Sequence, residues 1–392
     1  MGYFTCNALV SKFRYLCAFD LSNLSLRVVP FSIGELKHLR YLDLSENKIN
    51  FLPNTITKLL NLQTLKLNSC YSLIELPRDI IKLVNLRQLD ITSCSNLTHM
   101  PLGLGRLNSL EILTMFVVRE EHLKGSSCSW YKKKQGRTGG GLSELKELSN
   151  LGGSLMIRNL GHEKDDMVEC KATNMKEKQH LQELHLWWDQ VLDDGETKFY
   201  NEMSLEGLQP HPNLKMLWLS LYMGVRIPSW VSLLPNLVKL VVFNNKRLLH
   251  LPPLNQLPFL KSICLQLMAA LEYISDEDSI SNVLSGSSYS KTPFFPSLSY
   301  LELWNCPNLK GWWRNLDDDD DNELDRLLLP SFPPCLSQSK IVGCSNLTCM
   351  PLFPYLKEDL KMDGVSLKVL QQTMKMKMEA TTSPSSCYFP LS

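Results

Sequence analysis

The sequence predicts an α/β solenoid, in which short parallel strands stack side by side, and three observations support this prediction. One pattern of apolar residues recurs at steps of 23 or 24 residues, and its five copies begin at Leu16, Leu39, Leu62, Leu86 and Leu110. Further apolar residues follow three and then five positions after each start, and a proline ends each of the first four copies: Pro30, Pro53, Pro77 and Pro101. A single copy cannot bury its own leucines, so the copies must stack and share one core.

Within each copy the leucines belong to a short strand and its approach. Leucines spaced by two positions point to one side of a strand, and the residues between them point to the other side. The Leu-Pro or Met-Pro step disfavours an immediate helix and favours an extended return path. We therefore predict a leucine-rich repeat solenoid (a horseshoe), with a parallel sheet on the concave face. Irregular loops, 3₁₀ turns and short helices cover its convex face.

The residue that closes each copy is Asn47 in one repeat and a cysteine in several others: Cys70, Cys94, Cys306 and Cys344. A small polar side chain here can bond backbone groups that the turn leaves unpaired. The position suits a buried, reduced thiol, and the twelve cysteines include no Cys-x-x-Cys pair. A reducing, cytoplasmic location is therefore expected. Three Asn-x-Ser/Thr triplets, at Asn23, Asn96 and Asn346, leave an extracellular location open.

The pattern divides the chain into four parts. Regular repeats occupy residues 1–118, and a Ser-, Lys- and Gly-rich insertion, expected to be flexible, follows at 119–141. Less regular repeats occupy 142–361, with a helix expected within 162–180, and the segment 362–392 forms a tail with a helix expected from Val365 to Met378. Residues 1–15 are too short and too apolar to cap a stack, so we expect another domain before the first repeat.

Composition and motifs argue against catalysis. The 392 residues carry a net charge of +1, which gives no general attraction to nucleic acid or to an anionic membrane. No apolar run approaches the roughly 18 residues of a membrane span. The phosphate-binding loop, the zinc-protease helix and the nucleophile elbow of hydrolases are all absent from the sequence. The acidic run from Asp317 to Asp321 lacks the alternating ligands and glycine of a calcium loop, so it is interpreted as solvated. No enzymatic activity, cofactor or metal is expected.

The candidate site is the strand face, lined by the residues between the leucines. These residues are polar or charged in the first repeats and aromatic in the later ones, and aromatic side chains on an exposed face often anchor protein interfaces. The predicted protein-binding residues are Tyr41, Asp43, Lys66, Asp90, Trp187, Trp188, Trp218, Phe243, Tyr300 and Trp304. The alternative, that an outer loop folds back and buries the aromatic residues as core, stays open.

Several phrases resemble the repeat region of plant coiled-coil nucleotide-binding disease-resistance proteins. They include NSCYSLIELPRDIIKLVNLRQLDITSCSNLTHMP, SELKELSNLGGSLMIRNL, GLQPHPNLKMLWLSLYMGVRIPSWV and FPSLSYLELWNCPNLKGWW. The resemblance implies a repeat region that senses a pathogen effector, or a guarded host protein, and controls a nucleotide-binding switch. No switch domain is present in this sequence, which is expected to be a truncated member of such a family.

Two functions follow from the sequence. The first is a non-catalytic recognition module of the plant defence response. Its partner would be a pathogen effector, a guarded host protein, or a nucleotide-binding switch domain in cis or in trans. The alternative is an intracellular scaffold that binds a small GTPase or a phosphatase. The irregular second half favours the first function, because scaffolds of the second kind keep a regular period.

Overall fold

The computed structural model of the chain describes residues 10, 12–119, 140–161, 166–188, 195–255, 257–275, 295–313, 331–353, 359–369 and 371. The chain divides into two compact units, Met1–Gly224 and Val225–Ser392. Most of the predicted insertion, the acidic run at 317–321 and most of the predicted C-terminal helix lie outside the described residues.

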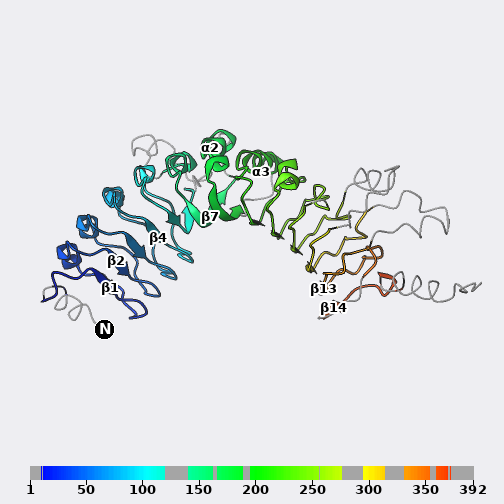
Figure 1. Cartoon of the computed structure of the whole chain (residues 1–392), viewed down its shortest axis with the longest axis horizontal. Helices are drawn as coiled ribbons and strands as arrows, with labels where there is room; N and C mark the ends of the chain where they lie inside the picture. Colours follow the sequence, from blue (N-terminus) through cyan, green and yellow to red (C-terminus); the bar gives the residue numbers. More distant parts are fainter. Residues whose placement is uncertain are drawn as a thin grey trace, which may run out of the picture. The chain divides into compact units, whose positions relative to one another are not determined.

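Strands of unit 1 run parallel and form two groups, within which neighbouring strands are hydrogen-bonded in chain order (Figure 1). A first sheet contains β1 (Ala18–Asp20), β2 (Tyr41–Asp43), β3 (Thr64–Lys66), β4 (Gln88–Asp90) and β5 (Ile112–Leu113). A second group contains β6 (Met115–Val117), β7 (Gly152–Leu160), β8 (His180–Trp188) and β9 (Met216–Ser220). The described strands that fall in the regular repeats thus confirm the predicted stack of short parallel strands.

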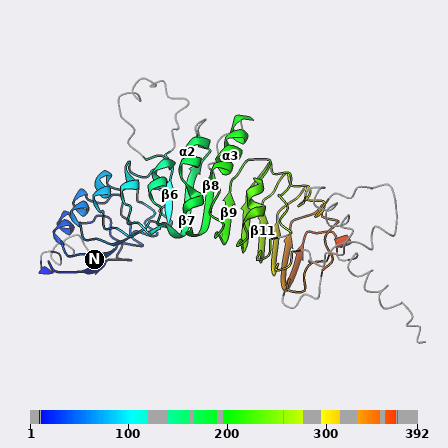
Figure 2. The same cartoon turned by 45° about the horizontal axis from the view of Figure 1, so that its top comes forward.

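Helices of unit 1 lie on the side of the repeats opposite the strands, with α2 and α3 beside one another (Figure 2). The 3₁₀ helices are η1 (Phe31–Glu35), η2 (Asn54–Lys58), η3 (Arg78–Lys82), η4 (Leu104–Arg106), η5 (Leu142–Glu147) and η6 (Met175–Glu177), and the α-helices are α2 (Asp166–Ala172) and α3 (Gly195–Gly207). Pro30, Pro53 and Pro77 are each extended, as expected, but a short 3₁₀ helix begins at the residue that follows each of them. Each proline caps its helix, because its carbonyl accepts the first N–H of the turn, from Ile33, Ile56 or Ile80.

The core of unit 1 consists of the repeated leucines, and the closing residues link one repeat to the next. Asn47 Oδ1 accepts hydrogen bonds from the N–H groups of Leu24 and Leu26, at 3.2 and 2.8 Å. Its Nδ2 donates to Leu21 and Leu44 carbonyls, each at 2.8 Å. These bonds satisfy buried backbone groups, as the sequence predicted.

Cysteine serves the same position in other repeats. Cys70 Sγ donates to the Leu44 carbonyl at 3.2 Å, and Cys94 Sγ donates to the Leu67 carbonyl at 3.1 Å. Both thiols are fully buried and free, and burial raises the pKa of Cys94 to about 12. A thiol held neutral in this way acts as a small, unreactive structural group.

Strand pairing changes between β5 and β6 at a single residue, Thr114. Its hydroxyl accepts the N–H of Ile91 at 2.9 Å, while its carbonyl accepts the N–H of Met156 at 3.0 Å. The hydroxyl therefore replaces the Thr114 carbonyl as the acceptor for β4, which frees that carbonyl to bond β7, while the Thr114 N–H still donates to the Leu89 carbonyl of β4 at 3.4 Å. The sequence pattern runs through this position without interruption, so the break was not predicted.

The described part of unit 2 contains five parallel strands in consecutive register. They are β10 (Lys239–Phe243), β11 (Ser262–Gln266), β12 (Tyr300–Trp304), β13 (Gln338–Val342) and β14 (Asp359–Asp363), and the unit also contains η7 (Ser229–Leu233). Strand β14 extends past residue 361, where the sequence placed the end of the repeats. Trp312 packs edge-on between Phe295 and Phe332, with ring centroids 5.4 and 5.2 Å away, and so fills part of the core of unit 2.

One backbone position is left-handed in many of the repeats. The residue just before the closing residue has a positive φ at Glu46, Ser69, Ser93, Leu221, Asn244, Leu267, Asn305, Gly343 and Gly364. Glycine and asparagine tolerate this conformation, whereas a leucine there is strained by about 1 kcal/mol. The turn that follows each strand is therefore set by backbone geometry as well as by the closing side chain.

Candidate protein-interaction surface

The strand face of β1–β5 brings together the four predicted residues of the first repeats. Tyr41 and Asp43 lie on β2, Lys66 on β3 and Asp90 on β4, and the register places Asp43, Lys66 and Asp90 side by side. Tyr41 Oη donates to Asp43 Oδ2 at 2.9 Å, and Lys66 Nζ lies 5.5 Å from the centre of the Tyr41 ring. These four side chains form one contiguous polar cluster.

Electrostatics of this cluster favour charged Lys66. Its interaction with the Tyr41 side chain raises the pKa of Lys66 most, burial lowers that pKa by less, and the negative charges of Asp43 and Asp90 raise it further. Burial, and then the hydrogen bond to Asp43, raise the pKa of Tyr41. Lys66 therefore presents a fixed positive charge between two carboxylates.

The aspartates in this cluster also have a structural role. Asp43 Oδ1 accepts the N–H of Ser45 at 2.9 Å, and Asp90 Oδ1 accepts the N–H of Thr92 at 3.1 Å. Such a bond two residues ahead stabilises the turn that leaves the strand. Because Asp43 is only 8% exposed, it contributes less to a binding surface than its place in the sequence suggested.

The second half of the unit 1 strand face carries two of the predicted tryptophans. Trp218 stacks on His185 of the neighbouring strand, with ring centroids 5.4 Å apart and an interplanar angle of 23°. Trp187 lies on β8, two residues after His185, and is 38% exposed. Aromatic surface held open to solvent in this way is typical of contact sites.

Trp188 does not belong to this surface, and its prediction as a binding residue was wrong. It is fully buried, with its ring 4.9 Å from Tyr222, and its Nε1 donates to the Ser204 hydroxyl of α3 at 3.0 Å. Because side chains alternate along a strand, Trp188 shares the inward side of β8 with Leu184 and Leu186. That alternation was visible in the sequence and would have separated Trp188 from Trp187.

The strand face of unit 2 brings together the remaining three predicted residues. Phe243, Gln266 and Trp304 occupy equivalent positions on β10, β11 and β12, and Tyr300 lies on β12. Trp304 is 38% exposed, whereas Phe243 and Tyr300 are partly buried. These three aromatic residues therefore share one face.

Two charged residues on this face were missed by the sequence reasoning. Glu302 Oε1 accepts a hydrogen bond from Lys340 Nζ at 2.6 Å, and its Oε2 accepts one from Tyr300 Oη at 3.0 Å. Burial opposes ionisation of Glu302, but the hydrogen bonds from Lys340 and Tyr300 outweigh it and lower its pKa. Burial, followed by the bond to Glu302, raises the pKa of Tyr300 to about 12. Glu302 stands between Leu301 and Leu303 in the sequence, and this alternation could have placed it on the strand face.

Within the described ranges, no group of three or more His, Cys, Asp or Glu side chains is placed to hold a metal ion. None of the helices in those ranges is long and apolar enough to cross a lipid bilayer.

The arrangement defines a leucine-rich repeat protein, and comparisons with known proteins agree. Residues 142–268 match the family model described as R13L1/DRL21 LRRs. The chain is also similar in fold to an internalin (inlF) from Listeria monocytogenes, with a TM-score of 0.50 and 14% identity over 93% of this chain and 86% of that one.

Curated relatives place the chain more narrowly. It is 34% identical over 345 residues to the disease resistance protein RGA2 of Solanum bulbocastanum, and 39% identical over 307 residues to RGA1 of the same plant. These alignments cover 86% and 78% of this chain but only 33% and 28% of the relatives. The chain is thus a leucine-rich repeat protein homologous over most of its length to plant disease resistance proteins, and it spans about a third of their length or less.

Proposed function

We propose that this chain is a cytoplasmic, non-catalytic recognition module of the plant defence response. In this proposal it binds a pathogen effector or a guarded host protein through its two strand faces. The observation that carries the proposal is the pair of tryptophans Trp187 and Trp304, each 38% exposed on a strand face. Trp187 lies two residues after His185, which stacks on Trp218, and Trp304 lies two residues after the charged Glu302.

The chemistry of these faces suits a folded protein partner. Exposed tryptophan supplies a large apolar contact area at low cost in conformational entropy, and it is enriched among residues that dominate binding energy. Lys66 in unit 1 and the Glu302–Lys340 pair in unit 2 add charges held in fixed positions. Such charges contribute more to partner selection than to affinity. Homology to disease resistance proteins supports a defence partner over a GTPase or phosphatase.

The test is a binding screen of the purified chain against secreted pathogen proteins, host proteins that such effectors modify, a small GTPase and a phosphatase. Any partner found is then titrated against Trp304→Ala and against the matched control Phe259→Ala. Phe259 is an exposed aromatic residue of the same unit that lies outside the strands.

Loss of one hot-spot tryptophan should weaken binding by about 2 kcal/mol or more, which is roughly thirtyfold. The proposal predicts that Trp304→Ala or Trp187→Ala gives this loss and that Phe259→Ala does not. A partner lost only with Phe259→Ala would refute the assignment of the strand faces. Selective binding of the GTPase or phosphatase would support the scaffold function instead.

A further inference from the structure

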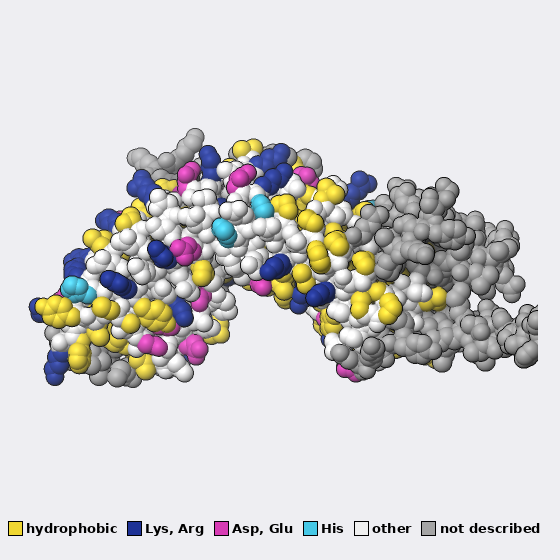
Figure 3. Space-filling view, viewed as in Figure 1, with side chains coloured by type: hydrophobic (Ala, Val, Ile, Leu, Met, Phe, Trp, Pro, Cys, Tyr) yellow, Lys and Arg dark blue, Asp and Glu magenta, His cyan; other side chains and the backbone are white. Residues whose placement is uncertain are grey.

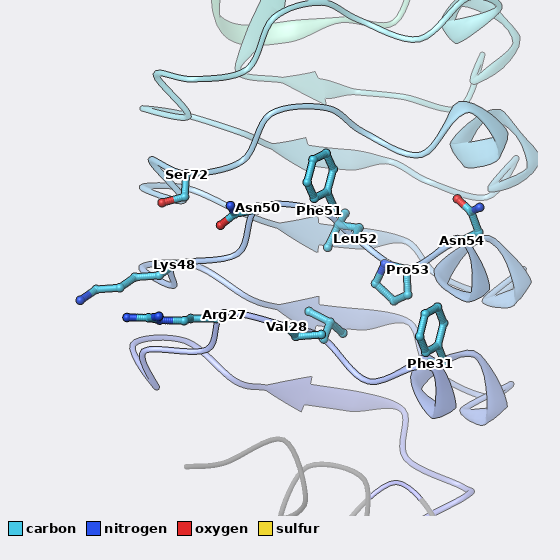
Figure 4. Close-up of a pocket in the computed structure, with 11 residues that line it drawn as sticks. Arg27, Val28, Phe31, Lys48, Asn50, Phe51, Leu52, Pro53, Asn54 and Ser72 are labelled. Carbon is cyan, nitrogen blue, oxygen red and sulfur yellow. The ribbon is translucent and has the colours of Figure 1, made fainter.

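A groove in unit 1 lies away from the strand face, between the return segments of the first two repeats (Figure 4). Its volume is about 730 Å³, within the range of ligand-binding clefts. The groove is lined mainly by the segments that lead from each strand to the next 3₁₀ helix, together with Phe31 and Asn54, which begin η1 and η2.

The middle of the groove is apolar and open to solvent. Val28 is 54% exposed, Phe31 is 64% exposed and Phe51 is 51% exposed. In the space-filling view, hydrophobic side chains gather over these N-terminal repeats, with Lys and Arg side chains among them (Figure 3). Large apolar side chains grouped in this way mark contact sites more often than isolated ones do.

One end of the groove is cationic. Figure 4 shows the side chains of Arg27 and Lys48 extending side by side from adjacent repeats. Among the residues that the structure describes, neither has an ion-pair partner. Two parallel cations with no carboxylate between them attract an anionic group, and arginine favours a carboxylate through its paired N–H donors.

Backbone pairing explains why the groove opens at this place. Between the second and third repeats, Ile74 N–H donates to the Asn50 carbonyl at 3.1 Å and Phe51 pairs with Glu75 as a parallel bridge. Between the first and second repeats the described return segments share the bond from Lys48 N–H to the Leu26 carbonyl, at 2.9 Å. No bridge equivalent to Phe51–Glu75 joins them within the described residues, and the groove lies along these less paired segments.

We propose that this groove binds an extended acidic–apolar segment of a partner protein. One or two carboxylates of the segment would contact Arg27 and Lys48, and leucine or phenylalanine side chains further along would cover Val28, Phe31 and Phe51. The return segment from Arg27 to Phe31 spans five residues, which corresponds to about 15 Å of extended chain. A segment of about five residues, acidic at one end and apolar at the other, therefore matches the groove in length and charge.

This surface is separate from the strand faces, so the inference does not depend on the proposed function. The probe is a fluorescein-labelled pentapeptide, Asp-Glu-Ser-Leu-Phe, with both ends blocked, titrated with the full chain and followed by fluorescence anisotropy. Two further peptides, Lys-Lys-Ser-Leu-Phe and Asp-Glu-Ser-Ser-Ser, remove the acidic and the apolar element in turn.

The decisive variant reverses both cations, R27E with K48E, and the matched control reverses two exposed cations outside the groove, R40E with K58E. Binding of the acidic–apolar peptide should weaken about tenfold in the groove variant, because two exposed charge contacts are lost. It should stay within twofold in the control and in Trp187→Ala. Phe51→Ser, checked for folding by circular dichroism, should also weaken binding, whereas neither of the two altered peptides should bind as tightly.

Absence of binding by the acidic–apolar peptide would overturn the proposal, as would equal binding by Lys-Lys-Ser-Leu-Phe. Equal loss in the R40E with K58E control would show non-specific attraction and would also refute it. A concentration-dependent dimer in light scattering that the groove variant abolishes would assign the groove to a second copy of this chain, which contradicts the proposal.

Discussion

Lys178 offers a sharp test of how the repeats are held together, because it is a lysine buried in the core of unit 1. Its side chain is 1% exposed, and Nζ donates to the carbonyls of Leu145 and Leu148 at 2.7 and 2.9 Å. These carbonyls belong to the end of η5 in the preceding repeat. Burial lowers the pKa of Lys178 from 10.5 to about 8. The structure thus keeps the cation only at a cost in free energy.

The sign of the pH effect follows from linkage. The pKa of Lys178 is lower in the folded chain than in the unfolded chain, so the unfolded chain binds more protons between pH 8 and pH 10.5. Stability from this group is therefore gained as pH rises through this window, and it is lost as pH falls through the folded pKa. A shift of 10.5 − 8 = 2.5 units sets a limit of about 3.4 kcal/mol, of which about 2.5 kcal/mol develops between pH 7 and pH 10.

The assay is urea unfolding, followed by tryptophan fluorescence in the presence of a reductant, for the wild-type chain and for Lys178→Met at pH 7 and pH 10. Methionine leaves two carbonyls unpaired at both pH values, so this loss cancels in the comparison. The wild-type advantage, measured as a free energy of unfolding, should be about 2.5 kcal/mol larger at pH 10 than at pH 7. A difference that is flat or that shrinks with pH would refute the account of Lys178 as a buried cation.

Three further predictions concern single contacts. Lys340→Met leaves the nearly buried Glu302 carboxylate without its cation, so thermal unfolding should show a loss of about 2 kcal/mol and NMR titration should show a raised pKa for Glu302. Leu267→Asn relieves a left-handed backbone and should raise the free energy of unfolding in urea by about 1 kcal/mol. Glu144→Ala removes two carboxylate bonds, 2.7 and 2.9 Å long, to backbone N–H groups of the preceding repeat. It should cost about 2 kcal/mol in calorimetry, whereas the exposed Glu147→Ala should cost almost nothing.

Periodicity gave the fold because the same interaction recurs in every repeat. From Leu39 to Leu113 the leucines of the repeated pattern are buried where the pattern placed them, whereas Leu16 of the first copy is only partly buried. The closing Asn47, Cys70 and Cys94 bond backbone carbonyls as expected. A leucine pattern that is repeated many times can be recognised even where single positions depart from it. One degenerate position, such as Ser339 in the last copy, does not erase it.

Features that occur only once were not predicted. The change of pairing at Thr114 depends on one hydroxyl that replaces a backbone acceptor, and many threonines in strands do no such thing. Helix α3 has a weakly amphipathic sequence, and it is fixed by tertiary contacts such as the bond between Ser204 and Trp188. Trp188 was misassigned because its aromatic character was weighed before its place in the strand alternation. The alternation of side chains along a strand predicts whether a residue is buried or exposed, whereas its aromatic character does not.

A comparison of equivalent positions separates structural residues from candidates for binding. Asp20, Asp43 and Asp90 occupy one position in three repeats, and each accepts an N–H two residues ahead at 2.8 to 3.1 Å. Lys66 occupies the same position in the third repeat and has no acceptor for that bond. Lys66 cannot make the turn-stabilising hydrogen bond that aspartate makes at this position, so a role in binding is a reasonable explanation of the lysine.

We expect two neighbouring substitutions on this face to differ in their effect on the free energy of unfolding. Asp90→Ala removes bonds to the N–H and hydroxyl of Thr92 and to the hydroxyl of Thr114, so urea unfolding should show a loss of about 1 to 2 kcal/mol. Lys66→Met removes no backbone bond and should change the free energy of unfolding by less than about 0.5 kcal/mol. A partner bound by this face should nevertheless lose affinity with Lys66→Met. If Lys66→Met destabilised the chain as much as Asp90→Ala, the lysine would be structural, and the cluster around Tyr41 would lose its main claim to be a binding site.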